Sequence, residues 1–181
     1  MRENSYFMDN NKILGYDFFR RDCLEVAPQL AGKIIARRMP DGEVIRLRIT
    51  ETEAYRGEED TACHASKGRT KRTELLYGEA GIIYVYLCYG MHWLMNVITG
   101  EKDTPQGVLF RACEVCDGPA KLTKRLGIDG SFNGQPLYGN KEIWIEDDGF
   151  RPEIITLPRV GINYATPEYR DIEWRFKIKV N

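Results

Sequence analysis

The stretch Val44-Ile-Arg-Leu-Arg-Ile-Thr-Glu-Thr-Glu-Ala-Tyr55 decides the fold, because it is a long strand pattern that turns acidic near its end. Side chains of a strand alternate between its two faces, so one face carries Ile45, Leu47 and Ile49. The same alternation places Glu51, Glu53 and Tyr55 on that initially apolar face. Because a buried carboxylate without a partner is costly, the acidic pair indicates either a paired structural site or a chemical site.

The segments around this strand predict a mostly antiparallel sheet with short helices. Further strands are expected at residues 33–39, 82–88, 93–98, 107–114, 142–146 and 174–180. One helix is expected at residues 24–31, where Pro28 is tolerable only in a first turn. Another is expected at residues 119–126, between Pro119 and the stop signal Gly127. Residues 56–81 lack periodicity and are expected to form a long ordered loop, where function tends to reside.

These elements predict an α+β fold. Residues 13–181 are expected to form a single mixed domain, with a curved, mostly antiparallel sheet, flanking short helices and a protruding β-hairpin. Residues 1–12 are polar and are expected to be a flexible N-terminus. We expect a monomer, because no heptad or apolar stripe marks a dimer surface.

Composition limits the function classes. Of 181 residues, 43% are hydrophobic, which excludes disorder, and 26 basic against 27 acidic residues give a net charge of −1. Bulk charge therefore attracts neither nucleic acid nor anionic membrane, and any polyanion site needs a local patch. The five cysteines are an odd number and the N-terminal residues show no secretory pattern, so free thiols in a reducing intracellular compartment are expected.

Residues 80–100 contain no Asp, Glu, Lys or Arg, which raises the alternative of a membrane span. Tyr84, Tyr86 and Asn96 have polar ends that a spanning helix would bury in hydrocarbon. Two strands joined at Tyr89-Gly90-Met91 explain the segment better. At such a tip Tyr89 and Met91 are unsheltered, and apolar wedges of this kind can enter between DNA base steps.

Several polar and aromatic residues could have a catalytic or binding role, and for each of them a purely structural role is the alternative. Arg111 lies in an otherwise apolar strand pattern, so it either pairs with Glu51 or Glu53 or points to solvent from an edge. A buried Glu beside an Arg can act as a general base. The rings of Tyr55, His64, Tyr84 and Tyr86 can stack on a nucleobase or fill a core, and core filling is favoured for Tyr84.

Two further motifs remain open or weak. The loop after His64 holds four basic residues that are either a solvated face or phosphate contacts: Lys67, Arg69, Lys71 and Arg72. The single pair Cys113-Glu-Val-Cys116 is weak evidence for zinc and is assigned to packing, so no metal is expected. Glycine-rich nucleotide-binding motifs and a GxSxG nucleophile turn are absent, and no cofactor is expected.

The order of the motifs along the chain is specific. They are Glu51-Thr-Glu53-Ala-Tyr55, Glu59-Asp60-Thr-Ala-Cys-His64, Tyr84-Val-Tyr86-Leu-Cys-Tyr89-Gly90-Met91, Met95-Asn96, Arg111-Ala112 and Gly118-Pro119-Ala-Lys121-Leu122. Together with Arg159-Val-Gly161 and Trp174-Arg175-Phe176, the series resembles the 3-methyladenine (alkyladenine) DNA glycosylase family. The similarity runs from about Leu14 to the C-terminus.

The resemblance implies an enzyme of base-excision repair that flips alkylated purines out of double-stranded DNA and hydrolyses the N-glycosidic bond without a metal. Glu53 matches the family's general base, which directs water against C1′, and Arg111 matches the residue that helps hold the water and the acid. The expected product is an abasic site without strand cleavage. Lys67 and Lys121 are close enough in sequence that a reactive lysine stays an alternative.

The resemblance also implies roles for the pocket and the hairpin. Tyr55, His64 and Tyr86 match the residues that sandwich the extruded base, Asn96 matches the residue that crowds the amino group of guanine, and Tyr89 matches the wedge. The sequence departs from the family at residues 69–74, where the usual Pro and Asn are missing. A non-catalytic binder of damaged DNA is therefore the alternative function.

Overall fold

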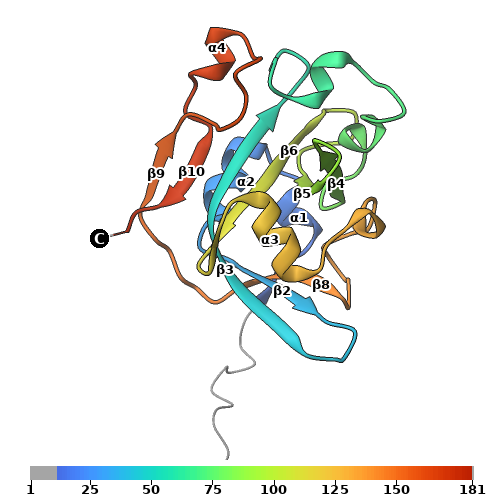
Figure 1. Ribbon diagram of the computed structural model, residues 1–181, viewed down its shortest axis with the longest axis vertical. Helices are drawn as coiled ribbons and strands as arrows, with labels where there is room; N and C mark the ends of the chain where they lie inside the picture. The colour runs from blue at the N-terminus through green and yellow to red at the C-terminus, as the bar shows by residue number, and fades with distance from the viewer. Residues whose placement is uncertain (1–11, 181) are drawn as a thin grey trace, which may run out of the picture.

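The computed structural model describes residues 12–180, which form one sheet with short helices around it (Figure 1). Seven strands follow one another across the sheet: β1 (Lys12–Ile13), β8 (Ile143–Asp147), β2 (Ile34–Arg38), β3 (Val44–Arg56), β6 (Gln106–Cys113), β5 (His92–Ile98) and β4 (Ile83–Cys88). Each of these pairings is antiparallel. The predicted α+β class is confirmed. The expected flexible N-terminus lies outside the described residues, apart from Lys12, which begins β1.

The central strand β3 is long enough to pair with two different strands along one of its edges. Its first half pairs with β2, and residues 51–53 pair with β10 (Arg175–Ile178), while β6 lies along the other edge. Two more strands extend the sheet, because β9 (Ile154–Leu157) pairs with β10, and β7 (Cys116–Asp117) pairs with the end of β6. The C-terminal strands therefore lie beside the acidic end of β3 (Figure 1).

The helices are short. They are α1 (Tyr16–Phe19), α2 (Cys23–Leu30), α3 (Pro119–Leu126), α4 (Pro167–Arg170) and the 3₁₀ turns η1 (His64–Lys67), η2 (Glu74–Tyr77) and η3 (Gly130–Phe132). The prediction for α3 is confirmed, since Gly127 adopts the left-handed conformation (φ 60°) that ends it. The placement of Pro28 in a first turn is wrong. Asp22 caps α2 and starts it at Cys23, so Pro28 lies near its end, where the helix loses only one internal hydrogen bond.

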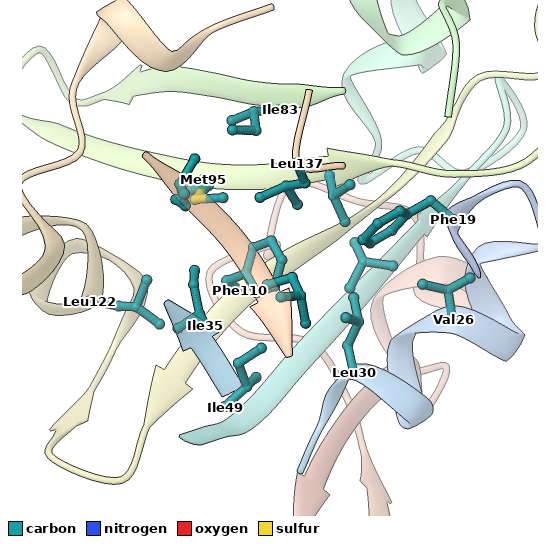
Figure 2. Packing of buried hydrophobic residues seen from close by; sticks show 14 of the residues in the cluster. Phe19, Val26, Leu30, Ile35, Ile49, Ile83, Met95, Phe110, Leu122 and Leu137 are labelled. Carbon is teal, nitrogen blue, oxygen red and sulfur yellow. The ribbon is translucent and has the colours of Figure 1, made fainter. Parts of the chain in front are cut away.

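One main hydrophobic core lies between the sheet and the helices α1, α2 and α3. Figure 2 shows side chains of the helices meeting those of the strands, and Leu30, Ile49, Phe110 and Leu122 are fully buried there. Burying a side chain of this size contributes roughly 1.5–3 kcal/mol relative to leaving it exposed. The core therefore fixes β3 and β6, the two strands that carry the acidic and basic residues of interest.

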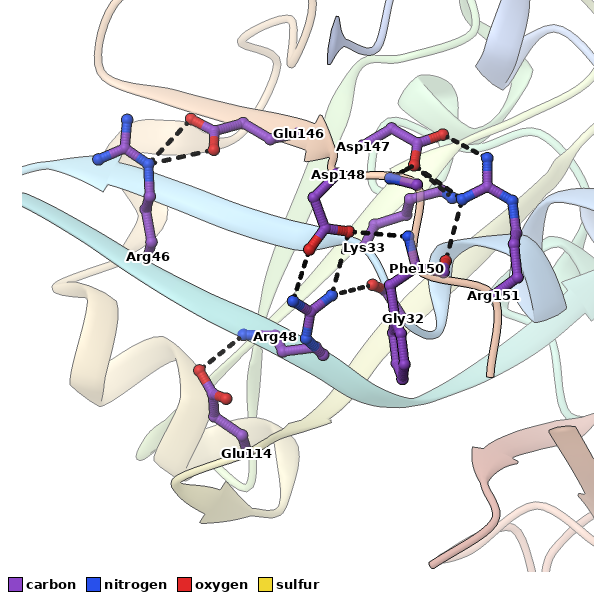
Figure 3. Close-up of polar contacts among 11 residues, drawn as sticks. Gly32, Lys33, Arg46, Arg48, Glu114, Glu146, Asp147, Asp148, Phe150 and Arg151 are labelled. Atoms are coloured by element: carbon purple, nitrogen blue, oxygen red, sulfur yellow. Dashed lines mark hydrogen bonds and ion pairs between the residues drawn. The ribbon is translucent and has the colours of Figure 1, made fainter. Parts of the chain in front are cut away.

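Ion pairs attach the turn after β8 to neighbouring strands of the sheet (Figure 3). This cluster lies at the other end of β3 from Glu51 and Glu53. Arg48 donates to Asp148 at 2.6 Å and to the carbonyl of Gly32 at 2.7 Å. The buried ammonium of Lys33 lies 3.0 Å from Asp147. These contacts join the turn after β8 to the start of β2 and to β3, and their residues do not line the cavity described next.

Candidate active site

The strand β3 changes the face that it turns toward the core. Its pairing with β6 shifts register on both sides of Glu51, which is the signature of a β-bulge. Before the bulge Ile49 packs in the main core, and after it the core side chains are Thr52 and Ala54. The prediction that Glu51 and Glu53 share the face of Ile49 is therefore wrong. The bulge reverses the alternation, and both carboxylates project from the opposite face of the sheet.

A cavity of about 450 Å³ lies on that second face. Its floor comes from alternate residues of four neighbouring strands, namely Tyr55, Leu109, Arg111, Leu94, Asn96, Tyr84 and Tyr86. Other lining residues form two walls: one is the loop that leads through Cys63 and His64 to Arg72, and the other is the segment 160–164. The structure thus brings together the predicted residues Tyr55, His64, Tyr86, Asn96 and Arg111.

Glu53 is fully buried beside this cavity and is held by three groups. The backbone N–H of Val160 donates to Oε1 at 2.9 Å, and the hydroxyl of Tyr55 donates to Oε2 at 2.9 Å. The Nε of Arg111 lies 3.5 Å from Oε1. Burial raises the pKa of Glu53, and the guanidinium of Arg111 acts against that rise. A carboxyl group fixed in this way can act as a general base.

Arg111 joins the two carboxylates of β3. Its Nε donates to Oε1 of Glu51 at 3.1 Å, and the same oxygen accepts a bond from Arg175 of β10 at 2.9 Å. Lys177 lies 3.7 Å from the other oxygen of Glu51. Arg111 is therefore an interior residue with acidic partners, and the alternative of an edge arginine in solvent is wrong. The strand β10 completes this charge network, which the sequence did not indicate.

Three aromatic rings line the cavity, and two of them meet edge to face. His64 and Tyr86 have ring centroids 4.6 Å apart at an interplanar angle of 66°, and Tyr55 lines the cavity next to them. Nδ1 of His64 is 2.9 Å from the hydroxyl of Tyr84, which is itself buried in a small cluster, so Tyr84 has a packing role and also holds the histidine. Burial, helped by Arg72, lowers the pKa of His64 and favours its neutral form.

Asn96 lies on the floor of the cavity in a fixed orientation. Its residue is buried, and its Nδ2 donates to the carbonyl of Tyr84 across the β4–β5 pair at 3.2 Å. A side chain held by the sheet itself cannot easily withdraw from a ligand. Asn96 can therefore discriminate among ring substituents by steric fit.

The β4–β5 hairpin ends in a strained tip beside the cavity. Tyr89 (φ 51°) and Gly90 (φ 70°) both have positive φ, and the N–H of Met91 donates to the carbonyl of Cys88 at 3.2 Å. Such a turn suits glycine but is costly for tyrosine. Tyr89 is nevertheless 87% exposed and Met91 is 69% exposed. Strain that holds a large ring in solvent is the kind found at functional sites.

The four basic residues of the loop differ in their surroundings. Arg72 lines the cavity, and Lys67 and Lys71 are exposed near it in sequence. Arg69 instead forms ion pairs with Glu74 and Asp103, each at 2.7 Å. Arg69 thus joins the loop to the connection between β5 and β6, and it lies in the region where the sequence departs from the family pattern.

Sequence reasoning missed a buried ion pair behind the cavity. Arg159 and Asp60 are joined by bonds of 2.6 and 2.8 Å, and both side chains are fully buried. The residues lie 99 positions apart, so no local pattern connects them. It also missed Tyr164, whose hydroxyl donates to the carbonyl of Ala62 at 3.0 Å and ties the two walls of the cavity together.

The cysteines are free thiols, and Cys113 packs in the main core with its sulfur 2.8 Å from that of Cys116. Among residues 12–180 there is no group of three or more His, Cys, Asp or Glu side chains that could hold a metal ion. Within the same described part of the chain, no helix has both the length and the apolar character needed to cross a membrane.

Fold and site together define a class: an α+β protein with one antiparallel sheet and a pocket lined by aromatic side chains beside a buried acid. The sequence pattern of the family described as "Methylpurine-DNA glycosylase" matches residues 17–181. This chain belongs to that family.

Curated relatives agree over nearly the whole chain. A protein of Natranaerobius thermophilus is 41% identical over 93% of this chain and 96% of its own length. Proteins of Nitrosococcus oceani and Clostridium botulinum are each 42% identical, over 91% and 93% of this chain and 89% and 96% of their own lengths. All three carry the name "Putative 3-methyladenine DNA glycosylase".

Proposed function

We propose that this protein is a DNA glycosylase that receives an alkylated purine flipped out of duplex DNA and hydrolyses its N-glycosidic bond. The names of the relatives give the substrate class, and the pocket supports it. A base inside a stacked duplex cannot reach a buried carboxylate, so the base must leave the helix before any reaction. The cavity of about 450 Å³ is large enough for one purine and small enough to surround it.

Glu53 is the general base of this proposal. Two donors, the Val160 N–H and the Tyr55 hydroxyl, fix its carboxylate, so the remaining lone pairs can orient one water molecule. The water gives a proton to the Glu53 carboxylate as its oxygen bonds to C1′ of the flipped nucleotide, and the bond between C1′ and the base nitrogen breaks, so that the base leaves with the electron pair of that bond. Arg111 holds the acid in place. The negative charge of Glu53 stabilises the oxocarbenium character that develops on the sugar.

The aromatic wall selects bases that carry positive charge. Purines methylated at N3 or N7 are cationic, and the faces of Tyr55 and Tyr86 attract cations. Asn96 excludes guanine by crowding its exocyclic amino group. These roles depend on rings and an amide that the sheet holds in place.

The hairpin tip and the basic loop contact the duplex in this proposal. Tyr89, with Met91, fills the gap that the flipped nucleotide leaves, which explains why a tyrosine is kept exposed in a strained turn. Lys67, Lys71 and Arg72 contact phosphates. Contact by Arg69 would require opening its ion pairs with Glu74 and Asp103.

Direct hydrolysis makes the enzyme monofunctional, with a free base and an abasic site as products. A lysine nucleophile would need to approach C1′ without a partner, whereas Lys121 is exposed and paired with Asp117 at 2.6 Å. The protein is proposed to act as an intracellular monomer.

The buried position of Glu53 between Arg111, Tyr55 and Val160 carries the proposal, and a single-turnover assay tests it. Wild-type protein is mixed in excess with methylated duplex DNA, and released 3-methyladenine and abasic sites are quantified. Glu53→Gln should abolish release while leaving the fold intact. Glu43→Gln, in the exposed turn before β3, is the matched control and should behave as wild type. Tight binding to the methylated duplex with no base released by wild type would support the alternative of a non-catalytic binder instead.

A further inference from the structure

The ion pair of Arg159 and Asp60 lies directly behind one of the rings that would hold the base. The guanidinium of Arg159 makes two bonds to Asp60 and donates to the carbonyls of Ala54 (3.0 Å) and Tyr169 (2.9 Å). Its charged carbon sits over the ring of Tyr55, 4.7 Å from the centroid. Tyr55 lines the cavity, and Arg159 is not among the residues that line it. The Tyr55 ring therefore separates a permanent cation from the space where a base would stack.

The rest of the surroundings of Arg159 is also unusual. The guanidinium carbon lies 5.2 Å from the ring centroid of Trp174, so the cation is held between two aromatic side chains. The Nε of Arg159 is buried and has no hydrogen-bond partner among the described residues. Arginine remains charged even when buried, so this site keeps a full positive charge. The carboxylate of Asp60 is its ion-pair partner, and Glu53 is a second acid that interacts with it electrostatically.

Charge on the far side of a ring changes what the near side attracts. A cation on one face of Tyr55 draws on the same ring electrons that would attract a cationic base on the other face, and it also repels that base directly. We propose that Asp60, by neutralising Arg159, keeps the Tyr55 face attractive to positively charged bases, and that this pair thereby determines the preference of the pocket for cationic over neutral purines. The inference rests on the proposed function and adds a positioning and specificity role for two residues that do not touch the base.

A purely structural role makes a different prediction. Asp60 also accepts bonds from the backbone N–H groups of Arg56 (3.1 Å) and Ala62 (3.0 Å), and so shapes the loop that ends at His64. If that were its whole role, its removal would weaken the binding of every base by a similar factor. The proposed role instead changes the ratio between a cationic base and its neutral counterpart.

The experiment measures this ratio by equilibrium binding. Two duplexes are compared that differ only in the charge of one base: 3-methyladenine, which is cationic, and 3-methyl-3-deazaadenine, which is neutral and of the same shape, and neither carries the amino group that Asn96 is proposed to crowd. Binding is measured in a Glu53→Gln background, so that the cationic base is not released. The guanidinium carbon of Arg159 lies 4.7 Å from the ring centroid of Tyr55, and a base stacked on the other face would lie ~3.5 Å beyond that ring, so charge and base would be ~8 Å apart. At this separation, the unneutralised charge of Arg159 in Asp60→Asn should lower the ratio of the two affinities about tenfold.

Two companion variants give opposite expectations. Arg159→Gln removes the cation, so its ratio should equal or exceed that of the parent protein. The double variant with Asp60→Asn and Arg159→Gln carries neither charge, and its ratio should return to about the parent value. If Asp60→Asn does not fold, a ratio for Arg159→Gln clearly below the parent value overturns the proposal by itself.

Asp147→Asn is the matched control, because it removes the partner of another buried cation, Lys33 (Figure 3), and neither residue lines the cavity. It should leave the ratio unchanged. Equal weakening of both duplexes by Asp60→Asn would show that the pair is merely structural and would refute the inference, while the proposed function would stand. A parent protein that binds neither modified duplex more tightly than unmodified DNA would contradict the proposed function itself.

Discussion

Replacing the tyrosine at the hairpin tip should strengthen the fold and weaken DNA binding. Tyr89 holds a left-handed conformation (φ 51°), which costs a non-glycine residue roughly 1–2 kcal/mol. Tyr89→Gly removes that cost, and the extra freedom of glycine in the unfolded chain returns ~0.5–1 kcal/mol. Because Tyr89 is 87% exposed, little packing is lost. The variant should therefore be more stable by about 0.5–1 kcal/mol, a rise in Tm of about 1–4 °C.

The same change removes the ring proposed to fill the gap in the duplex. Stacking of one base on an aromatic side chain is worth about 1–3 kcal/mol, so affinity for a duplex with a methylated purine should fall by about 5- to 150-fold. Thermal unfolding and fluorescence titration measure the two effects. Asp103→Gly is a matched control for stability alone, since Asp103 is the other described non-glycine residue with positive φ (66°) but also pairs with Arg69 of the basic loop. A less stable Tyr89→Gly, or one that binds the methylated duplex as wild type does, would refute this reasoning.

Three further expectations concern the pocket and the basic loop. Because burial raises the pKa of Glu53 above its ordinary value of 4.5, the pH profile of single-turnover release should rise through an acidic limb above pH 4.5. Glu51→Gln should move this limb to lower pH, since the guanidinium between the two acids then serves Glu53 alone; an unmoved limb would argue against that coupling. Asn96→Ser should raise the release of undamaged guanine by roughly 10-fold or more, as a steric contact in a pocket permits, and a lesion panel with competing normal purines checks this. Arg72→Ala should reduce the slope of log affinity against log salt by about 1, whereas Arg69→Ala should leave the slope unchanged because its ion pairs occupy it; equal slopes for both variants would show that these pairs open on DNA.

Local signals predicted the elements well where the signal and the structure lie in the same few residues. The helix between Pro119 and Gly127 begins and ends as expected, because each of these residues fixes its own backbone conformation. The hairpin at Tyr89-Gly90 was likewise readable from two strand patterns around a turn. The position of Pro28 was not, because it depended on where the Asp22 cap starts the helix.

The site shows the same division. Glu53 and Arg111 could be paired from sequence, since an acid and a base in two apolar strands each need a partner. The face on which they lie could not be predicted, because strand alternation assumes unbroken pairing and the bulge at Glu51 interrupts it. The pair of Asp60 and Arg159 was out of reach for another reason: it forms only when the C-terminal segment packs on the loop after β3.

Because of the bulge at residue 51, the odd-numbered side chains of β3 lie on the core face of the sheet before it and on the cavity face after it. Upstream of residue 51, the core positions of β3 are Leu47 and Ile49, where a substitution acts through the volume and shape of the side chain. Downstream of residue 51, the odd-numbered side chains of β3 form the hydrogen bonds and ion pairs beside the cavity, while the even-numbered side chains Thr52 and Ala54 are packed in the core. Deleting or inserting one residue at this position would reverse the faces of all downstream side chains of β3. Glu51 and Glu53 would then project into the hydrophobic core, and Thr52 and Ala54 would project toward the cavity.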